Sequence, residues 1–521
     1  MSKNPIISSL VILAFFFMAC QNESSTSSEE AAYYQELHRP QFHFSPESAW
    51  MNDPNGMVYF QGEYHLFYQY YPHSNVWGPM HWGHAISKDL ITWEHLPIAL
   101  YPDELGMIFS GSAVVDWKNT SGFGDGNTPP MIAMFTYHNM NGERTGATDF
   151  QTQGIAYSLD KGRTWTKYAG NPVIPNLGVR DFRDPKVIWH EASQQWVMVL
   201  AAKDRIQIFN SKDLKSWELA SEFEDKVANL GVWECPDLFP LSVEGSEQEK
   251  WVLIISHGDG GPSGGSCTRY LVGDFDGSTF KSDFPEDKVR WFDWGKDNYA
   301  GVTWSDVPEQ DGRRIFIGWM SNWQYAKAVP TIQWRSAMTI PRTLSLRNTP
   351  EGLSLVAAPI KELEDLRSKT IQLDPQEIEG HALIQNLDPS QAEITLTFDL
   401  ENSSSRSFGI ELSNPAGDIL RIHYDNDSDE LIVDRVNSGI TDFSTSFQGD
   451  LNYIPRPTGP NDMKWHLFLD KSSLELFVDD GLISVTDIFF PHEDFSAFKF
   501  FAFDGKAVLK EGTAYQLKGT W

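Results

Sequence analysis

The sequence predicts an all-β protein with two domains, a five-bladed β-propeller followed by a C-terminal β-sandwich. Three observations support this. A hairpin pattern recurs, a turn motif repeats in phase with the hairpins, and the residue pattern of the strands changes in the last third of the chain. With 521 residues and 41% hydrophobic content, the chain is long enough to bury more than one core.

Five strongly apolar segments indicate the hairpins, because each follows another strand-like segment. The segments are Tyr64–Tyr71, Met131–Tyr137, Trp196–Ala202, Trp251–Ser256 and Ile315–Met320. The strand pairs begin roughly 50–75 residues apart, at Asp53, Phe109, Asp184, Glu234 and Tyr299. Regular spacing of this kind predicts five copies of one supersecondary unit.

A Ser-x-Asp turn followed by a tryptophan comes after three of these hairpins. The copies span Ser87–Trp93, Ser158–Trp165 and Ser211–Trp217. Ser-x-Asp can close a turn, and the tryptophan can pack an outer strand. Since the copies are in phase with the hairpins, they favour a five-bladed propeller, which we assign to residues 37–357.

Beyond the propeller the pattern changes. Ile360, Leu363 and Leu366 have helical spacing, so residues 358–372 are expected to form a linker helix. Residues 373–521 show alternating strands with Asn, Asp, Gly and Ser turns, which predicts a β-sandwich. No comparable cluster of acids occurs there, and we assign this domain no chemistry.

The N-terminus predicts export. Residues 1–19 have a basic residue followed by a short apolar run, as in a signal peptide, and the segment before Cys20 resembles a bacterial lipoprotein cleavage site, with Phe17 where Leu is usual. Cys20 would then carry the lipid, and residues 20–36 would form a flexible tether. An ordinary secretory signal is the alternative. We expect a location at the bacterial cell envelope, on the outer membrane or cell surface, with membrane contact only through this lipid.

Composition limits the partners. A formal net charge of −30 argues against nucleic acid or an anionic substrate, whereas a neutral polymer is easier to accommodate. Cys235 and Cys267 form neither a disulfide framework nor a metal pattern, and we expect no metal and no cofactor.

Three short motifs each place an acid at the start of a strand, with a proline within two residues. They contain Asp53, Asp184 and Glu234. Each motif alone could be an ordinary turn. Because the first strands of propeller blades surround a common axis, the three acids are expected to converge at one mouth of the channel.

Two carboxylates facing each other across a polar pocket can cleave a glycosidic bond, one ionised and one protonated. Asp53 lies among turn amides, which can hold it as a carboxylate. Poor solvation between an aromatic residue and a cysteine would favour the protonated form of Glu234. Arg183 is expected to keep the adjacent Asp184 ionised, which suits binding of sugar hydroxyls.

The motifs Trp-Met-Asn-Asp-Pro-Asn-Gly, Arg-Asp-Pro and Glu-Cys-Pro resemble the three signatures of glycoside hydrolase family 32, the β-fructosidases. The resemblance extends from about Arg39 to the C-terminus. Further matches are Phe109–Ser112, Tyr299-Ala300, Gly318–Met320 and Leu474–Val478.

This resemblance implies a role for each matching residue. Asp53 would be the nucleophile that forms a covalent fructosyl-enzyme, Glu234 the acid and then the base, and Asp184 the stabiliser of the transition state. The mechanism would retain configuration, with the two reacting carboxyl groups roughly 5–5.5 Å apart. The implied substrate-binding residues are Trp50, Asn52, Gln69, Trp77, Phe109, Ser110, Arg183, Tyr299 and Trp319, with Trp82 as a further wall.

Members of the resembled family release fructose from levan, inulin or sucrose, and some act on sucrose 6-phosphate inside cells, against which an export signal argues. We expect an exo-β-fructosidase acting on fructans or fructo-oligosaccharides and on sucrose. An endo-acting levanase, a fructosyl transferase and a non-catalytic fructan-binding surface lipoprotein are the alternatives.

Overall fold

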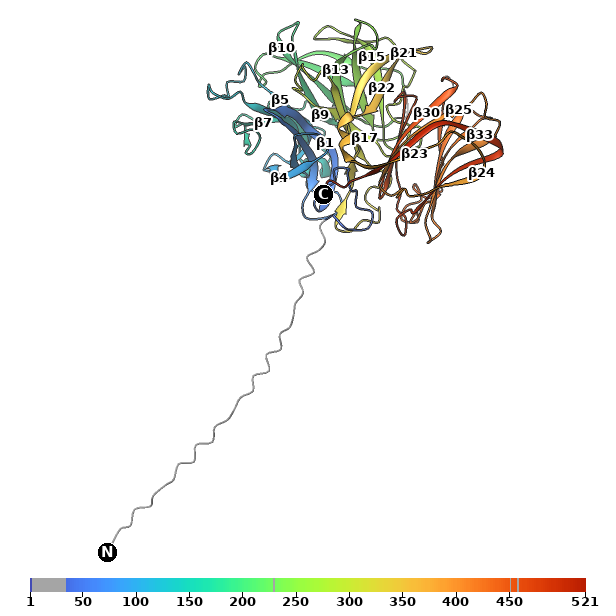
Figure 1. Ribbon diagram of the computed structural model, residues 1–521. Coiled ribbons are helices and arrows are strands. Elements are labelled where there is room, and N and C mark those ends of the chain that lie inside the picture. Colours follow the sequence, from blue (N-terminus) through green and yellow to red (C-terminus); the bar gives the residue numbers. More distant parts are fainter. Residues whose placement is uncertain (2–33, 228–229, 450, 457–458) are drawn as a thin grey trace.

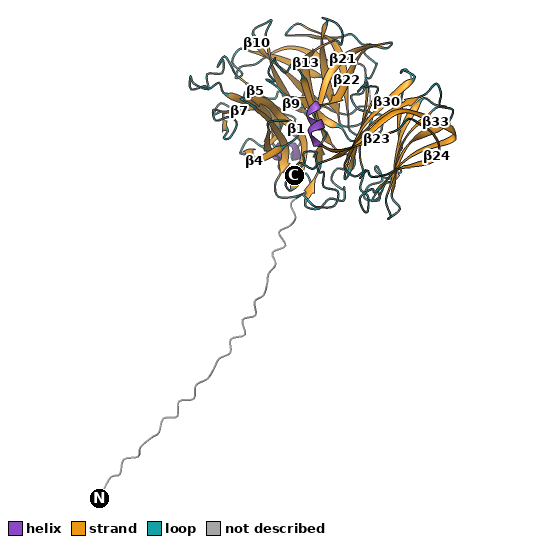
Figure 2. Cartoon of the chain, viewed as in Figure 1, coloured by secondary structure: helices purple, strands orange, loops and turns teal. Residues whose placement is uncertain are grey.

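The computed structural model describes Met1 and residues 34–227, 230–449, 451–456 and 459–521. Strands dominate these parts of the chain (Figures 1 and 2). The helical segments among them are two short ones, α1 (Met140–Arg144) and the 3-10 helix η1 (Lys361–Leu366). The predicted signal peptide and Cys20 lie outside the described residues.

Five antiparallel sheets form the first domain, each a meander whose strands follow one another in the chain. The first two blades contain β1 (Ala49–Phe60), β2 (Glu63–Tyr71), β3 (His81–Ser87) and β4 (Trp93–Leu100), then β5 (Met107–Val115), β6 (Met131–His138), β7 (Gln151–Ser158) and β8 (Thr166–Lys167). The third and fourth contain β9 (Phe182–His190), β10 (Gln195–Ala202), β11 (Ile206–Ser211) and β12 (Glu218–Phe223), then β13 (Trp233–Ser242), β14 (Glu249–His257), β15 (Cys267–Phe275) and β16 (Phe280–Ser282). The fifth contains β17 (Tyr299–Thr303), β18 (Arg314–Met320), β21 (Arg342–Thr349) and β22 (Gly352–Pro359), with β20 (Ala337–Met338) also paired to β18.

The blades close into a ring around the first strand of each sheet. β1, β5, β9, β13 and β17 contact one another in turn, and β17 also contacts β1. The closure is reinforced by β19 (Trp334–Arg335), a segment near the end of the propeller that pairs in parallel with the start of β1. The predicted five-bladed propeller is therefore confirmed.

The repeated Ser-x-Asp motif forms the same turn in all three copies. In each, the serine hydroxyl donates to the aspartate two residues later. Each tryptophan indole donates to the carbonyl three residues before it, from Trp93 to Leu90 at 3.2 Å and from Trp217 to Leu214 at 3.0 Å. The motif thus fixes the tryptophan at the start of the outer strand.

The second domain is a sandwich whose layers share one long strand. β33 (Ala497–Leu517, 21 residues) pairs through its first half with β24 and β26 and through its second half with β23 and β25. Left-handed backbone at Asp504 and Gly505 lies where the strand passes between the layers. The other strands are β23 (Arg367–Leu373), β24 (Gln376–Ile384), β25 (Ala392–Asp399), β26 (Ser407–Ser413), β27 (Ile419–Asp425), β28 (Glu430–Asn437), β29 (Leu451–Pro455), β30 (Asp462–Asp470), β31 (Ser473–Val478) and β32 (Ile483–Ile488).

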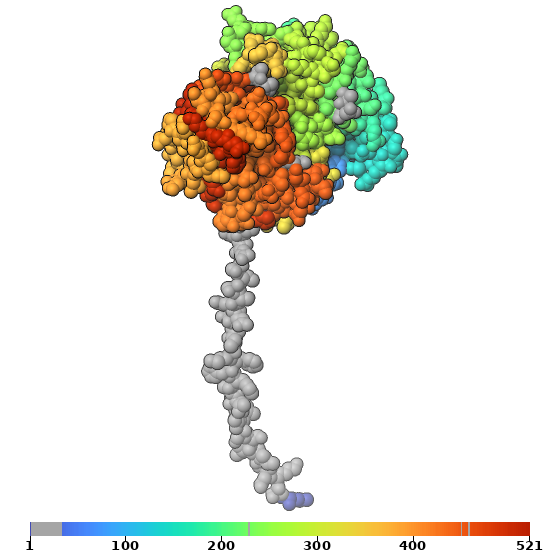
Figure 3. Space-filling model, turned by 90° about the vertical axis from the view of Figure 1, so that its right-hand side faces the viewer, coloured from blue at the N-terminus to red at the C-terminus, as the bar shows by residue number. Residues whose placement is uncertain are grey.

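The two domains pack directly against each other, as the orange and red surface of the sandwich beside the green surface of the propeller shows in Figure 3. Within the expected linker 358–372, only Lys361–Leu366 is helical, because β22 continues to Pro359 and β23 begins at Arg367. None of the helices in the described ranges has the length and apolarity of a membrane span.

Candidate active site

The three predicted acids lie at the same end of three of the five inner strands. Asp53 is in β1, Asp184 in β9 and Glu234 in β13. All three line one cavity of about 270 Å³. The sequence-based expectation that they converge at one mouth of the channel agrees with this arrangement.

Each of the five inner strands is irregular at this end. The pairing register with the second strand of the blade shifts at Met51–Pro54, Ile108–Gly111, Arg183–Lys186, Glu234–Asp237 and Tyr299–Val302. A bulge bends a strand and turns a side chain toward a new direction, and it also accepts a proline that lacks an N–H. This explains why Pro54, Pro185 and Pro236 accompany the acids.

Asp53 is held as an acceptor of two neutral hydrogen bonds. Ser110 Oγ donates to Asp53 Oδ2 at 2.7 Å, and Asn52 Nδ2 donates to Oδ1 at 2.9 Å. Burial raises the pKa of Asp53 above its ordinary value, and the hydrogen bonds from Ser110 and Asn52 oppose that rise. The site thus offers a carboxylate that two fixed donors keep in one orientation.

Asp184 differs from its expected state. Burial raises its pKa to about 7, although Arg183 acts in the opposite direction. The guanidinium is not in close contact with Asp184, since Arg183 Nε lies 4.0 Å from Asp184 Oδ2. Arg183 thus favours the ionised form of Asp184, as expected, but it is directed mainly at other acids and opposes the effect of burial only in part.

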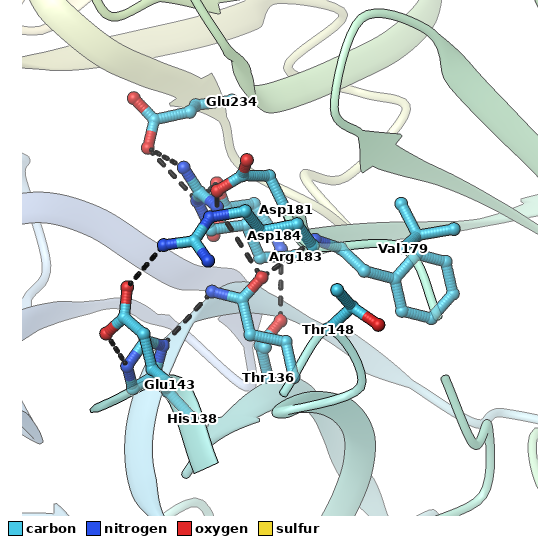
Figure 4. A network of polar contacts seen from close by, with 12 residues as sticks. Thr136, His138, Glu143, Thr148, Val179, Asp181, Arg183, Asp184 and Glu234 are labelled. Atoms are coloured by element: carbon cyan, nitrogen blue, oxygen red, sulfur yellow. Dashed lines mark hydrogen bonds and ion pairs between the residues drawn. The ribbon is translucent and has the colours of Figure 1, made fainter. Parts of the chain in front are cut away.

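Arg183 instead binds Glu234 and Asp181. Its Nη2 lies 2.9 Å from Glu234 Oε1, and its Nη1 lies 2.8 Å from Asp181 Oδ1 (Figure 4). Tyr299 donates its hydroxyl to the other oxygen, Glu234 Oε2. The side chain of Glu234 is 20% exposed, so its surroundings are polar and partly solvated rather than apolar as the sequence suggested.

Cys235 lies between the other two acids. Its backbone N–H donates to Asp184 Oδ2 at 3.0 Å. Its thiol lies 3.5 Å from the same oxygen and 3.7 Å from Asp53 Oδ2. The backbone of Asp184 and of Cys235 is left-handed, at φ 67° and 44°, and this unfavourable conformation is held by these contacts.

Six of the nine predicted substrate-binding residues line the cavity: Asn52, Gln69, Trp77, Phe109, Ser110 and Arg183. The amide nitrogen of Gln69 is buried and has no partner in the described part of the chain. Such a group is available to a ligand, because an unpaired buried donor is costly.

The other three predicted residues, and Trp82, support the cavity from behind. The indole of Trp50 donates to Asn52 Oδ1 at 2.7 Å and orients that amide toward Asp53. Trp319 is fully buried and packs 4.8 Å from Trp323, which does line the cavity. Trp82 donates to the carbonyl of Phe109 at 2.9 Å.

Further residues at the cavity rim were not predicted from the sequence. They are His138, Glu143, Phe150, Gln151, Asp181, Trp323 and Lys327. His138 Nε2 lies 3.1 Å from Glu143 Oε2, so the helix α1 is tied to β6 beside Arg183 (Figure 4). The position of Asp181, two residues before Arg183, was the available signal for Asp181. The others belong to no motif: His138 ends β6, Glu143 lies in α1 and Gln151 begins β7.

No group of three or more His, Cys, Asp or Glu side chains arranged to hold a metal ion occurs among the residues that the structure describes. The cavity presents carboxyl groups, the Arg183 guanidinium and neutral hydrogen-bonding groups. A pair of carboxyl groups with different surroundings is the arrangement that hydrolyses glycosides.

Comparison with known families matches most of the residues that the structure describes. The description "Glycosyl hydrolases family 32 N-terminal domain" matches residues 43–359, and "Glycosyl hydrolases family 32 C terminal" matches residues 362–516. The protein is thus a glycoside hydrolase. More narrowly, the chain belongs to glycosyl hydrolases family 32, as its three motifs suggested.

Two curated proteins and two solved structures illustrate what the chain is similar to. The chain is 50% identical over 496 residues to a levanase of Bacillus subtilis (strain 168), covering 94% of this chain and 72% of that protein. It is 39% identical to the extracellular exo-inulinase inuE of Aspergillus niger, covering 88% and 91%. Among solved structures, exo-inulinase from Aspergillus awamori has a TM-score of 0.86 at 36% identity, covering 94% and 100%. β-Fructofuranosidase from Schwanniomyces occidentalis complexed with fructosyl-erythritol has a TM-score of 0.85 at 32% identity, covering 94% and 99%.

Proposed function

We propose that this protein is an exo-acting, retaining β-fructosidase that releases terminal fructose from levan or inulin and from sucrose. The observation that carries the proposal is the set of three carboxyl groups in one small cavity. The names of the similar proteins, levanase and exo-inulinase, support fructans as the substrate.

In the first step, Asp53 attacks the anomeric carbon of fructose and Glu234 gives a proton to the departing oxygen. The bond from fructose to the rest of the sugar breaks, and an ester to Asp53 forms. Ser110 and Asn52 hold the attacking carboxylate in place, so little reorientation is needed during attack.

In the second step, Glu234 takes a proton from water while that water attacks the anomeric carbon and releases Asp53. Arg183 and the Tyr299 hydroxyl fix the carboxylate of Glu234 from both oxygens. Asp184 would hold furanose hydroxyls. With its pKa raised to about 7, this group can be present in either protonation state near neutral pH.

A trapping experiment tests the proposed intermediate. Fructosyl fluoride needs no acid to lose fluoride, so a Glu234→Ala variant should form the ester and then hydrolyse it slowly. Azide should restore turnover and yield β-fructosyl azide, which has the configuration of the substrate. An α-configured azide product would contradict the double-displacement mechanism.

The exo mode rests on cavity size. A volume of about 270 Å³ is below the range of roughly 300–1,000 Å³ typical of small-molecule sites, and it suits a chain end better than a long chain passing through. Early products from levan and inulin distinguish the alternatives: free fructose supports the exo mode, whereas short oligosaccharides support an endo-acting levanase. With concentrated sucrose, glucose released in excess over fructose would reveal transfer to sugar.

We also propose export and lipid attachment through Cys20. Two similar fungal proteins are named extracellular, which supports export. In an expressing bacterium, Cys20→Ala should abolish labelling by a radioactive fatty acid and release the protein from the membrane fraction. Unlabelled wild-type protein in the culture medium would instead support the ordinary secretory signal.

A further inference from the structure

A second cavity of about 720 Å³ lies at the opposite end of the propeller channel from the carboxyl groups. Its residues follow the catalytic motifs along the same inner strands. In β9, Asp184 is succeeded by Ile188 and Trp189, and in β13, Glu234 is succeeded by Phe239. Along these strands the lining extends from Lys186 to His190 and from Leu238 to Pro240, so the cavity begins two residues beyond Asp184 and four beyond Glu234.

A buried polar cluster lies between the two cavities. Lys186 Nζ is 3.1 Å from Asp237 Oδ2, and Thr303 Oγ1 donates to the same oxygen at 2.8 Å. These residues come from β9, β13 and β17, at positions between the catalytic motifs and the far cavity. The far cavity is therefore a separate compartment rather than an extension of the catalytic one.

Aromatic side chains form the walls of the far cavity. Trp117, Trp189, Trp251 and Phe239 are among them. Trp117 is 60% exposed, yet its indole donates to Asp306 Oδ1 at 2.8 Å. An exposed tryptophan held in one orientation is a preformed flat surface, because its position does not have to be fixed when a ligand arrives.

Among the polar groups of this cavity, Ser305 and Arg314 make few hydrogen bonds to the described residues, although the Arg314 guanidinium lies 5.2 Å from the centre of the Phe239 ring. The hydroxyl of Ser305 is buried, with the residue 8% exposed, and has no hydrogen-bond partner among the described residues. Arg314 makes one long hydrogen bond, at 3.4 Å to the carbonyl of Trp304, and no ion pair within the described ranges. Both groups line the cavity and can bind oxygen atoms of a ligand.

The charges around the cavity are balanced. Lys186 is paired with Asp237, and Lys118 lies 3.7 Å from Glu191. Arg314 faces a wall that also contains Asp306 and Glu249. An ionic ligand would meet a like charge here, whereas a neutral ligand with many hydroxyl groups would not.

We propose that this far cavity is a second binding site for a neutral oligosaccharide, with Trp117 as a stacking surface and Ser305 and Arg314 as hydrogen-bond donors. Pockets that combine apolar aromatic walls with a few placed polar groups are typical of small-ligand sites. The site would hold a glycan chain while another chain end is hydrolysed at the catalytic mouth.

Calorimetric titration of the full chain carrying Asp53→Asn tests this proposal, since that substitution prevents turnover. Nystose, a levan-derived tetrasaccharide and maltotetraose serve as probes. We expect two binding events per chain with at least one probe. Adding Trp117→Ala, or Ala192→Arg at the exposed rim of the cavity, should remove one event or weaken it at least tenfold.

Tyr453→Ala provides the matched control, because Tyr453 is an aromatic residue of the sandwich that is 50% exposed. It should leave both events unchanged. With Asp53 intact, Trp117→Ala and Ala192→Arg should keep the wild-type kcat/KM on sucrose, which shows that the propeller is folded. A single event with every probe, or two events that neither variant alters, would overturn the second site and leave the proposed hydrolase function standing.

Discussion

Two buried clusters of three carboxyl groups occupy different parts of this molecule. One is the proposed catalytic cluster of Asp53, Asp184 and Glu234. The other lies where the domains meet and contains Asp293, Asp470 and Glu475. At the interface, Arg342 lies 2.9 Å from Asp293 Oδ2 and 2.5 Å from Glu475 Oε2. His43 lies 2.8 Å from Asp470 Oδ2 and 3.0 Å from Glu475 Oε1.

The number of cations per acid separates the two clusters. Arg342 and His43 pair with the three acids at the interface. Burial lowers the pKa of His43, but its hydrogen bonds to Asp470 and Glu475 outweigh burial and raise that pKa to about 9, so His43 is charged at neutral pH. Among the described residues, Arg183 is the cation that pairs with acids of the proposed catalytic cluster, and burial raises the pKa of Asp53 and Asp184. At the interface, the paired charges connect the propeller to the sandwich. In the other cluster, buried carboxyl groups outnumber the cations, so their pKa values are raised and they can take part in proton transfer.

The largest expected effect is loss of the catalytic nucleophile. Asp53→Asn should lower kcat on sucrose by roughly 10⁴-fold or more, because the amide cannot attack the anomeric carbon. The thermal midpoint should not fall, since the substitution removes one buried carboxyl from an acid-rich cluster. Steady-state kinetics and calorimetry measure both quantities. Undiminished hydrolysis would show that Asp53 is not the nucleophile.

The second prediction concerns removal of the Arg342 cation from the interface cluster. Arg342→Leu should lower the free energy of unfolding by about 3–5 kcal/mol, because Asp293 and Glu475 would remain buried without their cation. Denaturation in urea measures this change. An effect below 1 kcal/mol would mean that the ion pairs at the interface are dispensable.

Asp184→Asn is the matched change in the catalytic cluster and should have the opposite sign. The folded pKa of Asp184, about 7, lies above the ordinary value of 3.8, so the stability that this carboxyl provides at low pH is lost as the pH rises through 7. Asparagine does not ionise. At pH 8 the variant should therefore be more stable than the wild type by about 1–3 kcal/mol, while losing activity.

The next prediction concerns how the free energy of unfolding depends on pH through His43 at the domain interface. Because the folded pKa of His43 is raised from 6.5 to about 9, its stabilisation is complete below pH 6.5 and disappears as the pH rises through 9. The unfolding free energy should fall by up to about 3 kcal/mol over this window. His43→Gln should lack that slope, whereas the same change at the exposed His381 should keep it.

The smallest expected effect concerns the hydrogen bond from Ser110 and its influence on the pKa of Asp53. Removing the Ser110 hydroxyl should raise the pKa of Asp53 further, because that hydrogen bond favours the charged carboxylate. In Ser110→Ala, the acidic limb of kcat/KM should move to higher pH by about one unit. Ser110→Thr keeps a hydroxyl and should restore the limb. A limb that stays in place in Ser110→Ala would show that another group controls it.

The sequence by itself predicted the architecture, and it named the groups that are proposed to react. Hairpin alternation, the Ser-x-Asp turns and the prolines beside the acids are local in the chain, and each constrains only its neighbours. Repetition then indicated five blades, and the equivalent positions of Asp53, Asp184 and Glu234 placed them at one mouth.

Only the tertiary structure shows which residues these acids and Arg183 contact. Arg183 is adjacent to Asp184 in the chain, yet its guanidinium binds Glu234, 51 residues away. Burial raises the pKa of Asp184 to about 7 although Arg183 opposes the rise. The far cavity forms from residues of four blades. Burial and the distance between charged atoms on different blades fix these properties, and neither quantity is present in the order of residues along a strand.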